Sequence, residues 1–277
     1  MRVLTGRTAV ITGAASGIGL ALTERFLAEG MSVVMADIEG PLLDQESARI
    51  EQLGGSVLAV TCDVSDPTQI EALRDAALSR FGAVHVLANN AGVASGHTNI
   101  RTTPEALQWV IGVNVLGVAY GVNAFAPLMV EQGEGHIVNT ASEAGLVATP
   151  MLGSYHVSKY AVVGLSESLA LELAGTGVGV SCLCPELVDT KIFESARNAH
   201  AATGLPKPGP IPMDQIEKFV GTVAMDPADV AADVTYAIKA DRFWIITHQV
   251  THARLLQRNA DLEAGRNPRN PVDRSGL

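Results

Sequence analysis

Cysteine is scarce in this 277-residue sequence, and its three cysteines are an odd number. Cys62, Cys182 and Cys184 include no C-x-x-C pair and have no pair of histidines nearby. A disulfide framework and a zinc site are therefore both unexpected. We predict reduced cysteines in the core of a cytoplasmic protein, and no bound metal.

Basic residues are also few, with 19 Lys and Arg against 29 Asp and Glu and a net charge of −10. No run of basic residues is present, so nucleic acid is not an expected partner. Five arginines between Arg254 and Arg274 are interspersed with acidic residues. This mixture predicts a C-terminal helix and a solvated polar tail for residues 251–277.

Basic flanks are missing from the one segment that is long enough to cross a membrane. Residues 106–130 carry no charge for 25 positions, but Glu105 and Glu131 stand where a spanning helix usually has Lys or Arg. Asn114 and Pro127 also interrupt the apolar run. We therefore predict a buried helix and no membrane association. The N-terminus has one short apolar run before a glycine-rich turn, so no signal peptide is expected.

Hydrophobic residues make up 47% of the chain, enough for a large globular core. Short β-branched runs alternate with helical stretches, which indicates a parallel sheet with right-handed crossovers. The predicted strands are 8–12, 31–36, 56–61, 84–89, 136–141, 178–184 and 243–247. The predicted helices are 17–29, 41–53, 67–81, 104–131, 155–174 and 227–240.

This alternation predicts an α/β fold, a single doubly wound Rossmann-type domain with a seven-stranded parallel sheet and helices on both faces. The domain is expected to span residues 1–250. One irregular stretch, 198–212, is rich in Pro, Gly and Ala. A loop of this length inside a compact domain is often a lid over a site, and we place the lid at residues 190–225.

A glycine-rich turn follows the first predicted strand, with Gly13, Gly17 and Gly19 in the sequence TGAASGIG. Such a turn lets a pyrophosphate approach the backbone amides at a helix N-terminus. Asp37 follows the second predicted strand, 18 residues after Gly19, near the ~20 expected of a carboxylate that binds the adenosine ribose. An acid there repels a 2′-phosphate, and the turn has no Lys or Arg, so NAD is favoured over NADP.

Tyr155 and Lys159 lie four residues apart in a predicted helix and so share one face. A phenol has an ordinary pKa near ~10 and is a poor base at neutral pH, but an ammonium group one turn away favours its phenolate. Such a pair can take a proton from an alcohol or give one to a ketone. Ser142 directly follows the fifth predicted strand, at the edge of the sheet where ligands of open α/β proteins bind.

Five motifs in order resemble the compact subgroup of the short-chain dehydrogenase/reductase family: T-G-x-x-x-G-x-G at 12–19, N-N-A-G at 89–92, Asn114, Ser142 and Tyr155-x-x-x-Lys159. The resemblance implies that Asn114, Ser142, Tyr155 and Lys159 are catalytic, with Asn114 holding a proton-relaying water through its main chain. The implied cofactor contacts are Gly13, Ser16, Gly17, Ile18, Gly19, Asp37, Asp63, Val64, Asn90, Ala91, Gly92, Tyr155, Lys159, Pro185, Val188 and Thr190.

The resemblance also implies an activity and an assembly. The activity is the NAD-dependent interconversion of a secondary alcohol and a ketone. Two alternatives stay open, an NADP-dependent carbonyl reductase and a nucleotide-binding protein that keeps the fold without turnover. The implied assembly is a homodimer or homotetramer formed through the helices at 104–131 and 155–174.

One position departs from the family pattern, because P-E-L-V-D-T at 185–190 has Glu186 where the family usually has Gly. We favour a Glu186 that faces solvent or bonds a nearby amide, since an unpaired carboxylate in an apolar site is costly. The alternative is a carboxylate that lines the pocket and selects a hydroxylated or cationic substrate. The expected substrate-side residues are Glu143, Leu152, Glu186 and Leu187, with Ala144, Ile192 and Phe193 nearby. Most of them are apolar, which favours a hydrophobic substrate.

Overall fold

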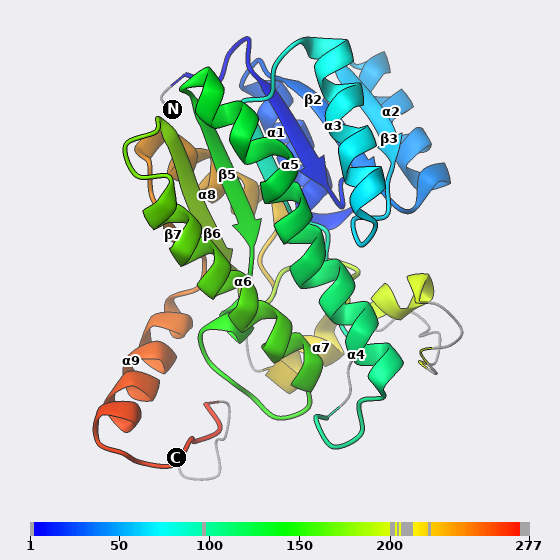
Figure 1. The fold of residues 1–277 in the computed structure, drawn as a ribbon. Helices are drawn as coiled ribbons and strands as arrows, with labels where there is room; N and C mark the ends of the chain where they lie inside the picture. Colours follow the sequence, from blue (N-terminus) through cyan, green and yellow to red (C-terminus); the bar gives the residue numbers. More distant parts are fainter. Residues whose placement is uncertain are drawn as a thin grey trace.

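The computed structural model describes residues 3–95, 98–199, 203, 205, 213–220 and 223–271. Within these residues seven strands, all paired in parallel, form one sheet in the order β3-β2-β1-β4-β5-β6-β7 (Figure 1). The strands are β1 (Thr8–Thr12), β2 (Ser32–Asp37), β3 (Val57–Thr61), β4 (Val86–Asn89), β5 (Gly135–Thr140), β6 (Val178–Cys184) and β7 (Trp244–Ile246). The predicted doubly wound sheet is confirmed.

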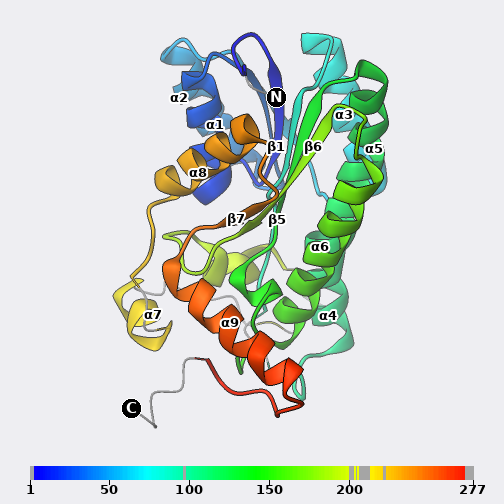
Figure 2. The same cartoon turned by 90° about the vertical axis from the view of Figure 1, so that its left-hand side faces the viewer.

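Helices cover both faces of this sheet, as Figure 2 shows with the sheet seen nearly on edge. One face carries α1 (Gly17–Ala28), α2 (Gly40–Gln52) and α8 (Pro227–Ala240). The other face carries α3 (Pro67–Phe81), α5 (Gly117–Gln132) and α6 (Gly153–Glu172). The helices α4 (Pro104–Ile111), α7 (Met213–Val220) and α9 (Gln249–Glu263) lie beyond one end of the sheet.

The strands are apolar throughout because successive side chains alternate between the two faces of the sheet, and both faces are covered. In β1, Ala9 and Ile11 pack into the core beneath α1 and α8, whereas Val10 packs into the core beneath α3 and α5. Successive side chains of a strand point to opposite faces, so a sheet with two covered faces needs apolar residues at every position. All three predicted core cysteines are free and buried.

The long apolar segment forms a helix that runs from Pro104 to Gln132. By length and composition it could cross a bilayer, and half of its most apolar 18-residue window is buried within the fold. The helix is not uniform, because a π-helical turn at Gly112–Leu116 separates α4 from α5. The sequence did not predict this turn, which contains the fully buried Asn114.

The predicted lid and tail are partly described. Residues 200–202, 204, 206–212, 221–222 and 272–277 lie outside the described residues. The chain forms a 3-10 helix at Ile192–Asn198, before these gaps, and α7 lies between the gaps at 206–212 and 221–222. The C-terminal helix begins at Gln249. In the segment predicted to form a helix and a solvated polar tail, Arg266 and Arg269 are 53% and 58% exposed and pair with Asp261. Arg254 is only 11% exposed and pairs with Glu143 and Glu186.

A buried chain of polar groups fixes the helix α6 against the sheet. Asn89 Nδ2 donates to Asn139 Oδ1 at 2.9 Å, and Asn139 Nδ2 donates to Ser166 Oγ at 3.1 Å. Ser166 in turn donates to the carbonyl of Val162 at 2.7 Å. Gly121 of α5 makes room for this network, because a Cβ there would lie 2.2 Å from Asn89 Oδ1. The network therefore joins β4, β5 and α6.

We predict that Asn139→Ala destabilises the protein by about 1–3 kcal/mol, because it leaves the buried Asn89 amide without its acceptor. Urea denaturation of the variant and of wild type measures the change. The matched control is Ser168→Ala on the same helix, whose exposed hydroxyl bonds Glu172 and whose loss should cost less than about 0.5 kcal/mol. Equal effects of the two variants would contradict this role of the network.

Candidate active site

A large cleft of about 1280 Å³ opens at the carboxyl ends of the strands. The predicted site residues come together there, although they lie on segments spread between Gly13 and Thr190. Of the predicted set, all but two line the cleft. The exceptions are Gly19, which supports the glycine-rich turn from behind, and Asn114, which is fully buried behind the wall.

The glycine-rich turn is shaped by close backbone contacts that exclude side chains. Gly13 and Gly17 adopt positive φ values of 67° and 53°, which favour glycine. A Cβ at Gly19 would lie 2.0 Å from the carbonyl oxygen of Gly13, and one at Gly17 would lie 3.0 Å from Thr190 Cγ2. The turn at the N-terminus of α1 thus presents bare backbone to the cleft, which fits a pyrophosphate.

The N-N-A-G segment is fastened to this turn through Thr12. The Thr12 hydroxyl accepts hydrogen bonds from the amides of Asn90 at 3.0 Å and Ala91 at 3.1 Å. Asn90 Nδ2 donates to the Thr12 carbonyl at 3.1 Å. These bonds join the ends of β1 and β4, so both segments form one continuous wall of the cleft.

Asp37 lies at the end of β2, across the glycine-rich turn. Its Oδ2 accepts from the amide of Ala15 at 3.0 Å, and its Oδ1 accepts from the amide of Glu39 at 3.0 Å. The carboxylate is therefore held in place at the cleft wall. This position beside the turn fits a carboxylate that binds a ribose hydroxyl.

Tyr155 and Lys159 lie on the first two turns of α6 and meet at the centre of the cleft. The Lys159 Nζ donates to the Thr140 carbonyl at 2.8 Å and lies 5.5 Å from the centre of the Tyr155 ring. Burial raises the pKa of Tyr155 to about 12, while its hydrogen bond with Ser142 acts in the opposite direction. Burial lowers the pKa of Lys159 to about 8. Both shifts follow from removing the charged form from water.

Asn114 supports this pair from behind. Its Oδ1 accepts from the Val93 amide at 2.8 Å, and its Nδ2 donates to the Val93 carbonyl and to Ser158 Oγ, each at 2.9 Å. A Cβ on Gly92 would lie 3.5 Å from both Asn114 Oδ1 and Lys159 Nζ. The Asn114 side chain therefore lies close to Lys159, and its polar atoms are bound to Val93 and Ser158.

The part of the cleft predicted to hold the substrate is built where β5 and β6 finish. Ser142 Oγ donates to the Pro185 carbonyl at 3.2 Å and accepts from the Ala144 amide at 3.1 Å. The Glu143 amide also donates to the Pro185 carbonyl, at 2.7 Å. These contacts fix Ser142 beside Tyr155, so the predicted serine, tyrosine and lysine do come together.

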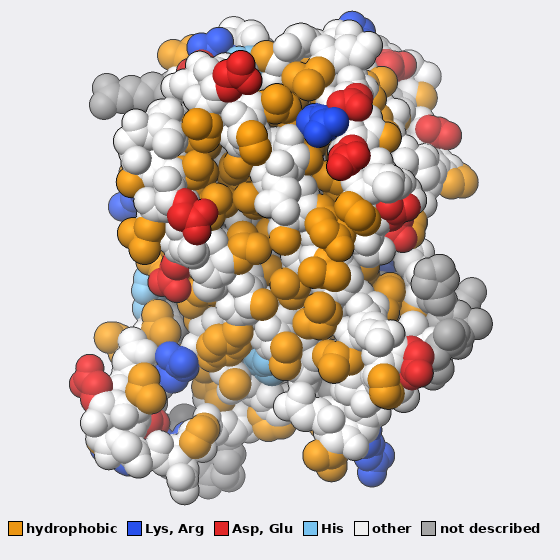
Figure 3. Space-filling model, viewed as in Figure 1, with side chains coloured by type: hydrophobic (Ala, Val, Ile, Leu, Met, Phe, Trp, Pro, Cys, Tyr) orange, Lys and Arg blue, Asp and Glu red, His pale blue; other side chains and the backbone are white. Residues whose placement is uncertain are grey.

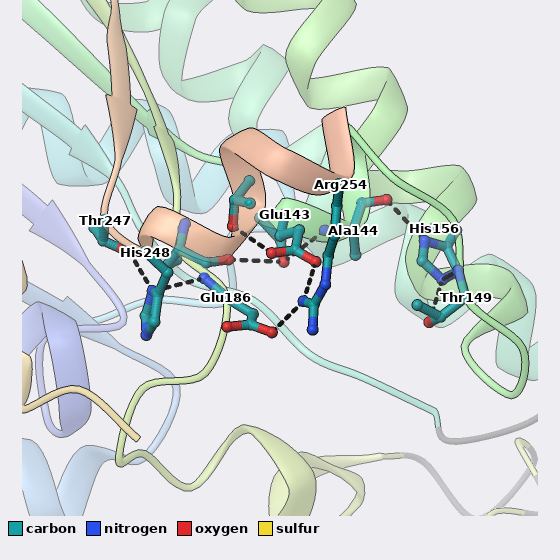
Figure 4. Close-up of polar contacts among 11 residues, drawn as sticks. Glu143, Ala144, Thr149, His156, Glu186, Thr247, His248 and Arg254 are labelled. Carbon is teal, nitrogen blue, oxygen red and sulfur yellow. Dashed lines mark hydrogen bonds and ion pairs between the residues drawn. The ribbon is translucent and has the colours of Figure 1, made fainter. Parts of the chain in front are cut away.

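Glu186 departs from the solvent-facing position that was one part of the interpretation we favoured from the sequence. Its side chain is only 6% exposed, so it does not face solvent, and its carboxylate pairs with the guanidinium of Arg254 (Figure 4). The same Arg254 Nη1 lies 2.7 Å from Glu143 Oε1. We disfavoured a carboxylate in the pocket because an unpaired one is costly there, but α9 supplies a charged partner.

His156 is a second residue whose function the sequence did not indicate. Its Nε2 accepts from the Thr149 amide at 2.9 Å, which leaves Nδ1 to donate to the Ala144 carbonyl at 2.8 Å (Figure 4). The imidazole thereby braces the loop between Ser142 and α6. A histidine directly after the tyrosine was the only sequence signal for this contact.

Part of the lid is docked onto the cleft. Ser195 accepts from the Ala94 amide at 2.8 Å and donates to its carbonyl at 3.1 Å. Arg197 Nε bonds Glu39 Oε1 at 2.6 Å. These contacts were not predicted, because they join residues of the predicted lid to the segments that follow β4 and β2, about which the sequence of the predicted lid carries no information.

Comparisons with known proteins identify the family. The family model described as short chain dehydrogenase matches residues 7–201. The chain belongs to the short-chain dehydrogenase family. It is 36% identical over 255 residues to 1-deoxy-11-beta-hydroxypentalenate dehydrogenase of Streptomyces exfoliatus, covering 91% of this chain and 86% of that protein.

Two further relatives support membership of this family. The 2-(R)-hydroxypropyl-CoM dehydrogenase of Xanthobacter autotrophicus is 41% identical over 193 residues, 68% of this chain and 77% of that protein. A crystal structure of a short-chain dehydrogenase/reductase from Burkholderia phymatum in complex with NAD superimposes with a TM-score of 0.92. It is 41% identical, and the match covers 99% of this chain and 100% of that one. This short-chain dehydrogenase is accordingly an oxidoreductase that acts on alcohol or ketone groups with a nicotinamide cofactor.

The lowered pKa of Lys159 gives a stability prediction. Without cofactor, the fold bears the cost of a buried ammonium below pH 8, and this cost falls as pH rises from about 8 toward the 10.5 of an exposed lysine. Lys159→Met removes this cost but also the hydrogen bond to the Thr140 carbonyl. The net effect should be to stabilise the cofactor-free protein by about 2 kcal/mol near pH 7. The gain should shrink above pH 8, as measured by urea denaturation.

The control for this prediction is Lys239→Met, which removes a partly exposed lysine paired with Glu29 on the surface. Its effect should stay below about 1 kcal/mol. A gain for Lys159→Met that is the same at pH 7 and pH 10 would contradict the assigned cause.

Proposed function

We propose that the protein is an NAD-dependent oxidoreductase that interconverts a hydrophobic secondary alcohol and its ketone. The observation that carries the proposal is the meeting of Ser142, Tyr155 and Lys159 in one cleft with a bare glycine turn and Asp37. The turn and Asp37 supply the features that a dinucleotide needs, and the other three supply a proton donor and acceptor.

In this proposal, bound NAD supplies the hydride acceptor for alcohol oxidation. The Ser142 hydroxyl holds the substrate oxygen beside Tyr155. The Tyr155 phenolate takes the hydroxyl proton, and in the reverse direction the phenol donates it to the ketone oxygen. Because burial raises the pKa of Tyr155 to about 12, its phenolate needs the nearby Lys159 ammonium to form at neutral pH.

Lys159 is buried and also needs a path by which its proton can reach solvent. We propose that a water held by the main chain at Asn114 provides it, because the Asn114 side chain is already bound to Val93 and Ser158. The surrounding π-helical turn alters the backbone hydrogen-bonding pattern of the helix there. Such turns occur frequently at functional sites.

Asp37 supports NAD over NADP. A 2′-phosphate on the adenosine would approach a fixed carboxylate, which repels it. The Arg197 guanidinium lies near this end of the cleft but is paired with Glu39. The Burkholderia phymatum relative was solved with NAD.

The walls of the substrate end support a hydrophobic substrate. Leu152, Leu187 and Phe193 line the same cleft as Ser142, as do Trp109 and Val147. Apolar walls with a few placed polar groups are typical of sites for small organic ligands. The names of the two curated relatives both denote hydroxylated substrates.

The test is a panel of apolar secondary alcohols and ketones, assayed by nicotinamide absorbance with NAD(H) and with NADP(H). Wild type should turn over members of the panel with NAD. Tyr155→Phe should keep most of its affinity for NADH, because the glycine turn, Asp37 and Lys159 remain, and should lose activity by about 10²–10⁴-fold.

If wild type binds NAD but turns over no member of the panel, the result would favour a nucleotide-binding protein without turnover. Tighter binding and faster turnover with NADP would instead establish the carbonyl reductase alternative. An active Tyr155→Phe variant would remove the tyrosine from the proposed mechanism.

We propose further that the protein forms a dimer or tetramer through α4, α5 and α6. Apolar side chains gather on the face of the molecule over these helices (Figure 3). Large exposed apolar residues there are Leu107, Leu116, Val130, Val157 and Leu171. A contiguous apolar surface of this kind is typical of a protein interface.

Leu116→Lys should weaken the assembly, because a charge would be buried in the interface. Light scattering should show a dimer or tetramer for wild type and a smaller mass for the variant. Leu53→Lys, at a 78% exposed position at the end of α2, is the matched control and should leave the mass unchanged. A monomeric wild type would refute the proposed assembly.

We also propose a cytoplasmic location. The three buried, free cysteines support it, because thiols stay reduced in that compartment.

A further inference from the structure

The carboxylates of Glu143 and Glu186 and the guanidinium of Arg254 form a buried charge cluster in the wall of the proposed substrate site, here termed the carboxylate clamp (Figure 4). The three side chains are 7%, 6% and 11% exposed. We propose that Arg254 is a positioning residue that holds Ser142 in place by keeping these two carboxylates together. The inference rests on the function proposed for Ser142.

The clamp joins the two chain segments that hold Ser142. Glu143 directly follows Ser142 at the end of β5, and Glu186 directly follows Pro185 at the end of β6. Between these segments run the two hydrogen bonds to the Pro185 carbonyl, from Ser142 Oγ at 3.2 Å and from the Glu143 amide at 2.7 Å. Any separation of the two carboxylates would therefore stretch the contacts that place the serine hydroxyl.

Charge makes such a separation the expected result of losing Arg254. Arg254 Nη1 bonds both Glu143 and Glu186, so one cation lies between two anions. Burial alone would lower the pKa of Arg254, but its hydrogen bonds with Glu186 and Glu143 raise it above the ordinary value. Without the guanidinium, two buried like charges would repel each other with little screening by solvent.

Other contacts anchor α9 in the same place. Thr251 donates a hydrogen bond to the Glu143 carboxylate. At the start of α9, His248 Nδ1 accepts from the Glu186 amide at 3.4 Å and bonds Thr247 Oγ1 at 2.7 Å. These contacts fix the backbone of α9 near both carboxylates, so the guanidinium has a defined position. The C-terminal helix thereby becomes part of the active-site structure.

Arg254 also lines the cleft, so positioning has to be distinguished from a different function, the direct binding of an anionic substrate group. The two functions predict different results when the charges are removed together. If Arg254 is a positioning residue, its loss no longer disturbs the loop once neither carboxylate is charged. If Arg254 instead binds substrate, neutralising the two carboxylates does not compensate for its loss.

The test measures amide hydrogen exchange of the cofactor-free protein, which needs no substrate. The reporters are the amides of Glu143, bonded to Pro185 O, and Ala144, bonded to Ser142 Oγ. Arg254→Met should speed their exchange by at least about tenfold, because the loop opens more often. The triple variant with Arg254→Met, Glu143→Gln and Glu186→Gln should restore exchange to within about threefold of wild type, since neutral amides do not repel.

Two controls separate this effect from general loss of structure. The Ala14 amide, bonded to the Ala36 carbonyl at 3.0 Å in the glycine-rich turn, should exchange equally in all variants. Arg258→Ala, one turn further along α9 at an exposed position, should leave the reporters unchanged. If Arg254→Met does not fold, Arg254→Lys replaces it. The reporter amides of Arg254→Lys should exchange faster than those of wild type, but by less than about tenfold.

The activity assay adds a second readout, with the panel alcohol that wild type oxidises fastest. Arg254→Met should lower kcat by at least about tenfold, while affinity for NAD stays within about twofold because the glycine turn and Asp37 are untouched. Unchanged exchange in Arg254→Met, or exchange as fast in the triple variant as in the single one, would overturn the inference. Failure of the proposed function would give a different result. Wild type would then turn over none of the panel alcohols, while Arg254→Met would still speed the exchange of the reporter amides.

Discussion

The parallel pairing of β1, β4, β5 and β6 is the constraint on which the active site depends. Parallel strands finish at the same edge of a sheet, so the segments that follow them meet there even when they lie far apart in the sequence. The glycine turn, the N-N-A-G segment, Ser142 and Glu186 each follow one of these strands. Hydrogen bonds from Asn90 and Ala91 to Thr12 then lock neighbouring segments together.

Buried charge is handled in two ways at this edge. Lys159 donates to the neutral Thr140 carbonyl, so its pKa falls with burial and its charge depends on its surroundings. Glu143 and Glu186 instead share a guanidinium that keeps a full charge at any physiological pH. The first arrangement suits a group that takes part in proton transfer, and the second suits a group that fixes structure.

Much of the fold was predictable because its signals are local. Each predicted strand agrees with an observed one to within two residues at either end, since a strand covered on both faces is an unbroken apolar run bounded by turns. The π-helical turn at Gly112–Leu116 was not predictable. Its residues suit a regular helix, and the wider turn accompanies the packing of Asn114 on Val93 and Ser158.

The sequence alone determined the individual strands, the glycine turn and the shared helix face of Tyr155 and Lys159, because each depends on residues within a few positions of one another. Only the tertiary structure decided the partner of Glu186. Arg254 lies 68 residues away, in a stretch of mixed charge that resembles any solvated helix. A buried carboxylate requires a cation, but any cation that the fold brings close can satisfy it, so local sequence cannot identify which one does.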